Sequence, residues 1–303
     1  MITLDRLPES PLQTIHHPLL KQHKITLVVK RDDLLHPLIQ GNKWRKLKYN
    51  LLHMQQSGVS ELVTFGGAFS NHLYATAMAC KTFAITGHAI IRGPQLDDNN
   101  PTIKMARACG LSLHPVTRIE YRQRHQPDYL NALQHQFPNA FIIPEGGSNS
   151  LALNGVKELA EQLPKSDYVM TAVGSGGTLA GLAQGLAPET QLIGVAVLKG
   201  AEYLAAEIRT MLDGKESAAW HLEHDFHHGG YAKVTPELLQ FCHTMKQHYR
   251  LPLEPIYTGK LFYALFSLVA QGQFPSGATI TAIHTGGLQG LDGLRYMNLM
   301  NVR

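Results

Sequence analysis

The chain has 303 residues, of which 44% are hydrophobic and 17% are charged, a balance that suits a compact globular protein and excludes intrinsic disorder. Its formal net charge of +4 is small for this length, and its lysines and arginines are scattered, so the charge pattern does not indicate nucleic-acid binding. The length exceeds what a single core comfortably fills, so we expect one large domain or two interlocked domains.

The cysteines and the N-terminal segment predict the compartment. Cys80, Cys109 and Cys242 are odd in number and widely spaced, so they form neither a disulfide framework nor a CxxC metal motif. Residues 1–18 contain acidic residues and two histidines but lack the apolar run of a secretory signal. No uninterrupted apolar stretch reaches membrane-spanning length. We therefore expect a soluble cytoplasmic protein.

Apolar runs typical of strands alternate with amphipathic stretches typical of helices. The expected strands cover 25–31, 61–65, 88–91, 140–143, 168–173, 191–197 and 278–283. The first long helix carries an apolar stripe from Trp44 to Met54, with Asn42 as its expected N-cap and Gly58 as its C-cap. Further helices are expected at 71–81, 102–109, 151–163, 178–186, 201–212, 236–249 and 260–271. This alternation predicts an α/β fold with mostly parallel sheets flanked by helices.

The first chemically informative segment is the turn Gly41-Asn42-Lys43, which follows the run Lys30-Arg31-Asp32-Asp33 and leads into a helix. A lysine held in a crevice can lose its proton through desolvation and attack a carbonyl group, as formation of a Schiff base requires. A lysine at a helix start is also a common solvated residue. This segment alone therefore does not identify a site.

The second segment joins a strand to a helix through two glycines, Gly66 and Gly67, and the run Ser70-Asn71-His72. Glycines allow a tight turn, and the free N–H groups of a helix start attract an anion such as a carboxylate or phosphate. Ser70 also suits a helix N-cap, and the two roles are compatible. His72 is either a general acid or base or a polar surface residue.

The third segment, Gly174-Ser175-Gly176-Gly177-Thr178, lies between a strand and a helix. Its consecutive backbone amides, its hydroxyl groups and the helix dipole are typical of a phosphate site. It lacks the Lys-Ser/Thr ending of a P-loop, and Leu179 occupies the third glycine position of the dinucleotide fingerprint. The segment therefore indicates a lone phosphate rather than a nucleotide.

Two other patterns carry no chemistry. The histidines at 221, 224, 227 and 228 have no cysteine or acidic partner at a recognisable ligand spacing, so we expect no metal site there. The glycines beside Ser175 stand too close for the Gly-x-Ser-x-Gly elbow of hydrolases.

Taken in order, these segments resemble the fold-type II pyridoxal-phosphate enzymes, which have a tryptophan synthase β-like fold, and within them the group of D-cysteine desulfhydrase and 1-aminocyclopropane-1-carboxylate deaminase. The resemblance rests on residues 30–33, 41–47, 70–72, 143–149, 174–178, 255–260 and 284–287, and spans nearly the whole chain. It implies a large pyridoxal-phosphate-binding domain of residues 1–45 and 148–303 and a small mobile domain of residues 46–147. It also implies a homodimer, with a small amino acid as substrate and no nucleic-acid or membrane partner.

The resemblance implies a role for each site residue. Lys43 would hold the cofactor as an internal aldimine and move the α-proton, and Ser70 would hold the substrate carboxylate. Tyr257 would act as a second acid or base over the reacting carbon. The residues implied in cofactor binding are Lys43, Asn71, Gly174, Ser175, Gly176, Gly177, Thr178 and Thr285, and those implied in substrate binding are Ser70, Asn71, His72, Tyr231 and Tyr257.

Two threonines distinguish between the activities of this group. The deaminase pattern has a glutamate at the position of Thr258 and a leucine at that of Thr285, whereas both threonines resemble the desulfhydrase. A carboxylate near the pyridine nitrogen favours its protonation and hence electron withdrawal, and a hydroxyl does so less, which suits a substrate with a good leaving group. We therefore expect α,β-elimination of the D-cysteine desulfhydrase type, giving pyruvate, ammonia and sulfide.

Three alternatives stay open at this point. The first is opening of the ring of 1-aminocyclopropane-1-carboxylate to 2-oxobutanoate and ammonia, and the second is a different elimination or racemisation of an amino acid on the same cofactor. The third is a catalytically silent sensor that binds pyridoxal phosphate or an amino acid. The departures from the family pattern lie on the expected substrate side. Ala232 and Lys233 replace the residues that usually follow Tyr231, and Glu145 is unusual before two glycines. The cofactor is therefore better defined by the sequence than the substrate.

Overall fold

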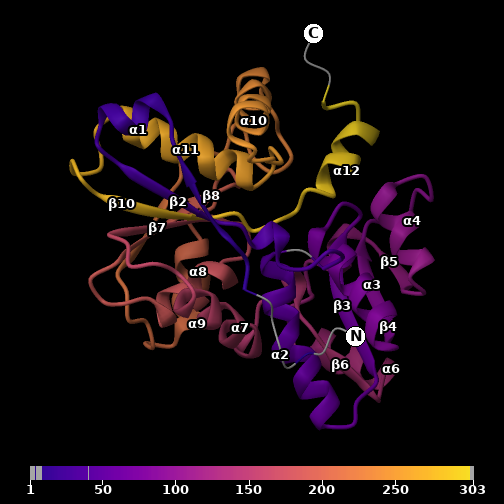
Figure 1. The fold of residues 1–303 in the computed structure, drawn as a ribbon. Helices are drawn as coiled ribbons and strands as arrows, with labels where there is room; N and C mark the ends of the chain where they lie inside the picture. The colour runs from indigo at the N-terminus through magenta and orange to yellow at the C-terminus, as the bar shows by residue number, and fades with distance from the viewer. Residues whose placement is uncertain (1–3, 5–8, 40, 301–303) are drawn as a thin grey trace.

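The computed structural model describes residue 4, residues 9–39 and residues 41–300, so part of the N-terminal segment 1–18 lies outside the described residues. Its larger sheet has the strand order β1-β2-β10-β7-β8-β9 (Figure 1). These strands are β1 (Leu12–Ile15), β2 (Thr26–Lys30), β10 (Thr279–Ile283), β7 (Tyr168–Val173), β8 (Gln191–Ala196) and β9 (Trp220–Glu223). Only β1 pairs in the antiparallel direction.

The smaller sheet is parallel throughout and has the order β5-β4-β3-β6. Its strands are β5 (Ser112–Val116), β4 (Thr86–Arg92), β3 (Glu61–Gly67) and β6 (Ala140–Ile142). All four lie in one stretch of the sequence, whereas the strands of the larger sheet come from both sides of it. The central strands β3, β4, β7 and β8 are largely buried, as expected for parallel strands with helices on both faces.

Helices cover both faces of each sheet (Figure 1). On the larger sheet, one face carries α1 (Pro18–Gln22), α10 (Pro236–Tyr249) and α11 (Thr258–Ala270), and the other carries α7 (Ser150–Glu161), α8 (Gly177–Gly185) and α9 (Leu204–Leu212). On the smaller sheet, α2 (Asn42–Gln56), α3 (Asn71–Phe83) and α4 (Pro101–Ala108) face α5 (Arg118–Tyr121) and α6 (Pro127–Gln136) across the strands. Helix α12 (Gly290–Tyr296) packs near α4, and two short 3-10 helices cover Asp32–Leu34 and Glu145–Gly147.

The α/β fold predicted from the sequence is confirmed, and most predicted elements lie within a few residues of the observed ones. The sequence missed strands β1, β5 and β9 and helices α1, α5, α6 and α12. The N-cap prediction for α2 was wrong by one residue, because Gly41 and not Asn42 occupies that position. No helix in the described ranges is long and apolar enough to cross a membrane.

Candidate active site

A cavity lies where the carboxyl ends of strands from both sheets meet, the usual ligand position in open parallel sheets. Its volume is about 710 Å³. The loops after β3, β6, β7, β8 and β10 line it, together with the start of α2. It gathers every predicted site residue except Gly177, namely Lys43, Ser70, Asn71, His72, Gly174, Ser175, Gly176, Thr178, Tyr231, Tyr257 and Thr285.

The first turn of α2, which carries Lys43, is fixed from two sides. Gly41 has a φ of +61°, and a Cβ atom there would lie 1.9 Å from the carbonyl oxygen of Thr285, so only glycine fits this position. Arg45 forms a fully buried ion pair with Asp32, with Nε 2.5 Å from one carboxylate oxygen and Nη2 2.8 Å from the other. The Lys-Arg-Asp-Asp run of the sequence therefore acts by holding this helix in place.

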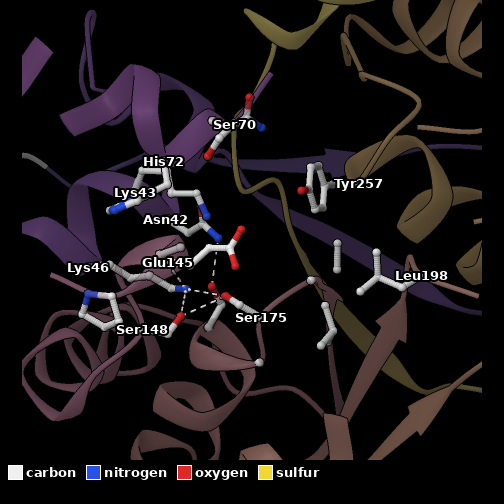
Figure 2. A pocket seen from close by; sticks show the side chains of 18 of the residues that line it. Asn42, Lys43, Lys46, Ser70, His72, Glu145, Ser148, Ser175, Leu198 and Tyr257 are labelled. Atoms are coloured by element: carbon white, nitrogen blue, oxygen red, sulfur yellow. Dashed lines mark hydrogen bonds between the residues drawn. The ribbon is translucent and has the colours of Figure 1, made fainter. Parts of the chain in front are cut away.

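Lys43 lines the cavity from this turn (Figure 2). Burial lowers the pKa of Lys43 to about 8. Its amine is therefore largely neutral above pH 8 instead of above pH 10, and the neutral amine is the nucleophilic form. The adjacent Asn42 donates from Nδ2 to Thr178 Oγ1 at 2.9 Å, which ties the start of α2 to the Gly174–Thr178 loop.

The Gly174–Thr178 loop leaves β7 and begins α8, so it presents the N–H groups of a helix start to the cavity. Gly176 has a φ of +77°, which favours glycine. Gly177 leaves no room for a side chain, because a Cβ atom there would lie 2.6 Å from Ser148 Oγ. The loop therefore has no bulky side chain, as a phosphate site built from backbone N–H groups requires.

Lys46 is the most informative residue that sequence reasoning left out of the site. Its Nζ donates to Ser148 Oγ at 2.8 Å and to the Gly146 carbonyl at 3.2 Å, and it lies 3.5 Å from Ser175 Oγ (Figure 2). Burial, together with the charge of Lys43, lowers the pKa of Lys46 well below its ordinary value. The spacing of three residues from Lys43, which places both amines on one face of a helix, was the signal that could have found it.

An anion would stabilise the charged form of this buried amine. Lys46 is 1% exposed, and in the described part of the chain it has no ion pair with a carboxylate. An uncompensated buried ammonium costs several kcal/mol, roughly, so a ligand with a negative group at the adjacent loop would stabilise it. The amine and the loop therefore form one anion site built from two helices.

The turn after β3 offers donors on the other side of the cavity. Ser70 is the N-cap of α3, and its Oγ accepts from the N–H of Leu73 at 3.2 Å, which leaves its O–H free to donate. Asn71 accepts at Oδ1 from Gln289 Nε2 at 3.2 Å, so its Nδ2 is the part that is available to a ligand. Both side chains thus present donors, as an anionic or carbonyl-bearing ligand requires.

His72 is a buried, neutral residue at the edge of this turn. Its Nε2 lies 2.8 Å from Thr64 Oγ1, and its Nδ1 has no partner among the described residues. Burial and the charges of Lys43 and Lys46 lower the pKa of His72 well below its ordinary value. It can therefore offer or accept a hydrogen bond, but it carries no charge at neutral pH.

Tyr257 and Lys43 lie on opposite sides of the cavity in the view of Figure 2. Burial, with further contributions from Tyr231 and nearby carboxylates, raises the pKa of Tyr257 well above its ordinary value, so its phenol keeps the proton. Thr285 lines the cavity at the end of β10, but Thr258 does not. The hydroxyl of Thr258 instead donates to Glu254 Oε1 at 3.0 Å, away from the open space.

The outer part of the cavity is charged. Arg124, which the sequence did not single out, donates from Nε to Glu145 Oε2 at 2.6 Å, and both residues line the cavity. The histidines at 221–228 lie elsewhere, and no group of histidine, cysteine, aspartate and glutamate side chains in the described ranges is arranged to hold a metal ion. The unusual Glu145 is thus part of an ion pair that lines the cavity.

The residues of the cavity fit pyridoxal phosphate. Lys43 supplies an amine of lowered pKa for the aldehyde, and Lys46, which has no ion pair in the described part of the chain, lies beside the glycine loop where a phosphate would lie. Two buried acceptor or donor atoms, Gln289 Oε1 and His72 Nδ1, have no partner among the described residues. These groups match the aldehyde, phosphate and ring substituents of the cofactor.

Comparisons with known proteins give the same result. The family model described as pyridoxal-phosphate dependent enzyme matches residues 6–286. The bifunctional D-cysteine desulfhydrase/1-aminocyclopropane-1-carboxylate deaminase, mitochondrial, of Arabidopsis thaliana is 30% identical over 292 residues, covering 88% of this chain and 73% of that protein. The D-cysteine desulfhydrase of Serratia proteamaculans (strain 568) is 32% identical over 288 residues, covering 88% of this chain and 87% of that protein.

A solved structure shows that the likeness extends to the whole fold. The crystal structure of an ACC deaminase homologue matches with a TM-score of 0.83 at 26% identity and covers 97% of this chain and 94% of that chain. The predicted cofactor, fold type and class of pyridoxal-phosphate-dependent lyase or deaminase are confirmed by these matches. The chain therefore belongs to the family of pyridoxal-phosphate dependent enzymes, with the architecture of fold type II.

Proposed function

We propose that the protein converts D-cysteine and water to pyruvate, ammonia and sulfide by α,β-elimination. The observation that carries this proposal is the placement of Lys43, Ser70 and Tyr257 around one cavity, with the hydroxyl of Thr285 at the end of β10. The two relatives named for D-cysteine desulfhydrase activity support the same substrate class.

The cofactor would be held at four points. Lys43 would bind it covalently, and the Gly174–Thr178 loop with Lys46 would hold its phosphate. The free Nδ2 of Asn71 would donate to the ring oxygen, and Thr285 would face the pyridine nitrogen. When bound, pyridoxal phosphate supplies an electron sink that stabilises negative charge at the α-carbon of the substrate.

The protein groups would position the substrate and move its protons. The O–H of Ser70 and the N–H groups at the start of α3 would hold the α-carboxylate. The neutral amine of Lys43 would take the α-proton, because its pKa of about 8 suits a base near neutral pH. The protonated phenol of Tyr257 would donate a proton to the departing thiolate.

The groups near the end of β10 favour elimination over ring opening, because none of those that the structure describes is a free carboxylate. Thr285 offers a hydroxyl there, and the carboxylate of Glu254 is turned to the backbone of the α11 start, where it accepts from the N–H of Thr258 at 2.6 Å. Electron withdrawal by the cofactor is then weaker than beside a free carboxylate. A thiolate leaves Cβ readily under these conditions, whereas a cyclopropane carbon needs the stronger sink.

The decisive test compares kcat/KM for D-cysteine, L-cysteine and 1-aminocyclopropane-1-carboxylate on the cofactor-loaded enzyme, with sulfide, pyruvate and 2-oxobutanoate measured as products. We expect D-cysteine to be turned over at least about tenfold more efficiently than the cyclopropane substrate, which corresponds to ~1.4 kcal/mol in the barrier. A preference for the cyclopropane substrate would make the protein a deaminase. Cofactor binding without turnover of any of the three would make it a sensor.

Three broader features accompany this function. Residues 46–147 would form a small mobile domain against residues 1–45 and 148–303, supported by the four strands of the smaller sheet, which all lie within that stretch. A homodimer, which the family resemblance implies, is checked by light scattering. A cytoplasmic setting is supported by three cysteines that are free in the structure.

A further inference from the structure

Two charged side chains that do not line the cavity are buried directly behind it. Glu254 is 1% exposed and lies just before α11, and Lys260 is 0% exposed and lies in the first turn of that helix. They do not form an ion pair with each other. Burial of a charge costs several kcal/mol, roughly, unless its hydrogen bonds are satisfied, so the partners of each group indicate its role.

Glu254 binds the backbone on both sides of Tyr257. Its carboxylate accepts from the N–H of Ile256 at 2.7 Å, of Tyr257 at 3.1 Å and of Thr258 at 2.6 Å. Tyr257 occupies the N-cap position of α11 but makes no capping bond with its own side chain. The carboxylate therefore replaces a conventional cap, and it fixes the peptide units from which the phenol extends.

Lys260 binds the loop that carries Tyr231. Its Nζ donates to the carbonyl of Gly230 at 2.7 Å and to that of Val197, just beyond β8, at 3.2 Å. The loop is irregular, with φ values of +117° at Gly230 and +54° at Ala232. The ammonium group therefore tethers an irregular loop to the end of a central strand.

The two tyrosines meet at the cavity. Their ring centroids lie 6.1 Å apart in an edge-to-face arrangement, and both rings line the cavity. The ring of Tyr257 also packs against the Gly174–Thr178 loop, because a Cβ atom on Gly174 would lie 3.0 Å from that ring. A small shift of either backbone would therefore change the space above the substrate.

We propose that Glu254 and Lys260 are positioning residues, which set Tyr257 and Tyr231, respectively, against each other over the substrate. This inference rests on the proposed function only for its kinetic consequence, because the positions of the two rings can be measured without turnover. Glu254 would therefore affect only the position of Tyr257, and Lys260 only that of Tyr231.

The ionisation of Tyr257 gives a readout that a merely structural role would not move. Burial raises the pKa of Tyr257, and the groups facing it, Tyr231, Glu254 and Glu145, raise it further. Replacing Glu254 with glutamine removes one negative charge near the phenol. The pKa of Tyr257 should therefore fall in that variant, because the phenolate is then less disfavoured.

The first experiment uses holoenzyme labelled with 3-fluorotyrosine, with the two resonances assigned by Tyr231→Phe and Tyr257→Phe. In Glu254→Gln the resonance of Tyr257 should shift and titrate at lower pH, and in Lys260→Met that of Tyr231 should shift. Glu237→Gln is the matched control and should move neither resonance; it removes an exposed carboxylate on α10 that accepts a hydrogen bond from Tyr263 of α11. Unmoved resonances and an unchanged titration in both folded variants would overturn the proposal.

The second experiment is a pair of double-mutant cycles on the preferred substrate. Glu254→Gln should lower kcat about tenfold in the parent but have no further effect in Tyr257→Phe, because it acts through that phenol. Lys260→Met should mainly raise KM, also about tenfold, and lose its effect in Tyr231→Ala. Additive effects would overturn the proposal. If Glu254→Gln does not fold, Glu254→Asp, which keeps the charge but withdraws the acceptor, should shift the Tyr257 resonance, and an unmoved resonance would count against it.

Discussion

The two ends of the active-site cavity are built in different ways. The cofactor end, around Lys43 and Lys46, is bounded by the starts of α2 and α8, where glycine contacts and the buried Asp32–Arg45 ion pair fix the backbone. The substrate end, around Tyr231, is bounded by an irregular loop between β9 and α10. In that loop Ala232 has a φ of +54°, a backbone conformation that residues other than glycine rarely adopt.

This contrast explains which part of the function can be predicted from the sequence. At the cofactor end, local backbone geometry makes the site, and that geometry demands glycine and lysine at fixed spacings. At the substrate end, the shape depends on how an irregular loop is held by Lys260 and how Tyr257 is held by Glu254. The cofactor therefore follows from motifs, and the substrate follows from tertiary contacts.

The largest expected effect concerns the cofactor end. Lys43→Ala should abolish the borohydride-reducible bond between cofactor and protein and lower turnover by at least about a thousandfold, because both the covalent anchor and the base are lost. The fold should be retained, as judged by circular dichroism. Lys46→Ala is the matched control, because it removes an amine from the same helix face but should keep the reducible bond. A reducible bond in Lys43→Ala would identify a different lysine.

The second prediction weakens the phosphate site. Lys46→Met should raise the dissociation constant of pyridoxal phosphate by about 10- to 100-fold, since a hydrogen bond to a charged group contributes roughly 1.5–3 kcal/mol. The measurement is a cofactor titration of the apoenzyme. Lys48→Met, on the same helix but bonded to Glu158 at 2.7 Å, should leave the constant unchanged.

Gly176→Val tests the backbone half of the same site. A Cβ atom at this position would lie 2.6 Å from Ile208 Cγ1, and the φ of +77° strains any residue but glycine, so the loop should distort and cofactor affinity should fall. Equal cofactor affinity in Gly176→Val and the parent would show that the phosphate does not bind at this loop.

The fourth prediction concerns pH at the cofactor end. Because the pKa of Lys43 is lowered to about 8, its neutral fraction rises tenfold per pH unit below that value and levels off above it. The rate of covalent cofactor capture by the apoenzyme should follow this curve. A rate that keeps rising to pH 10 would mean that the amine has its ordinary pKa.

The smallest expected effect concerns the substrate end. Ala232→Gly should raise the free energy of unfolding by about 0.5 kcal/mol, because relief of the left-handed conformation slightly exceeds the entropy that glycine adds to the unfolded chain. Asp213→Gly, at a φ of +52° in the C-cap of α9, is the control. Both should be measured by denaturant unfolding, but only Ala232→Gly should change KM. Equal KM values in the two variants would show that the loop around Ala232 does not contribute to substrate binding.

The strands that the sequence missed share one property. β1, β5 and β9 all lie at the edge of a sheet, whereas every central strand was predicted. An edge strand is paired on one side only and is partly solvated, so it needs no continuous apolar run. β5 even contains Pro115, which an edge tolerates and a central strand does not.

By itself, the sequence predicted the α/β fold, because apolar runs alternate with amphipathic stretches, and it predicted the cofactor through the family resemblance that its ordered motifs carry. Only the tertiary structure decided that Lys46 joins that loop from another helix and that Thr258 turns away from the cavity. It also placed Glu254 and Lys260 behind the two tyrosines. Such contacts join residues that are far apart in the sequence, by 129 residues for Lys46 and Ser175, and no local pattern records which side chains will meet once the sheets are assembled.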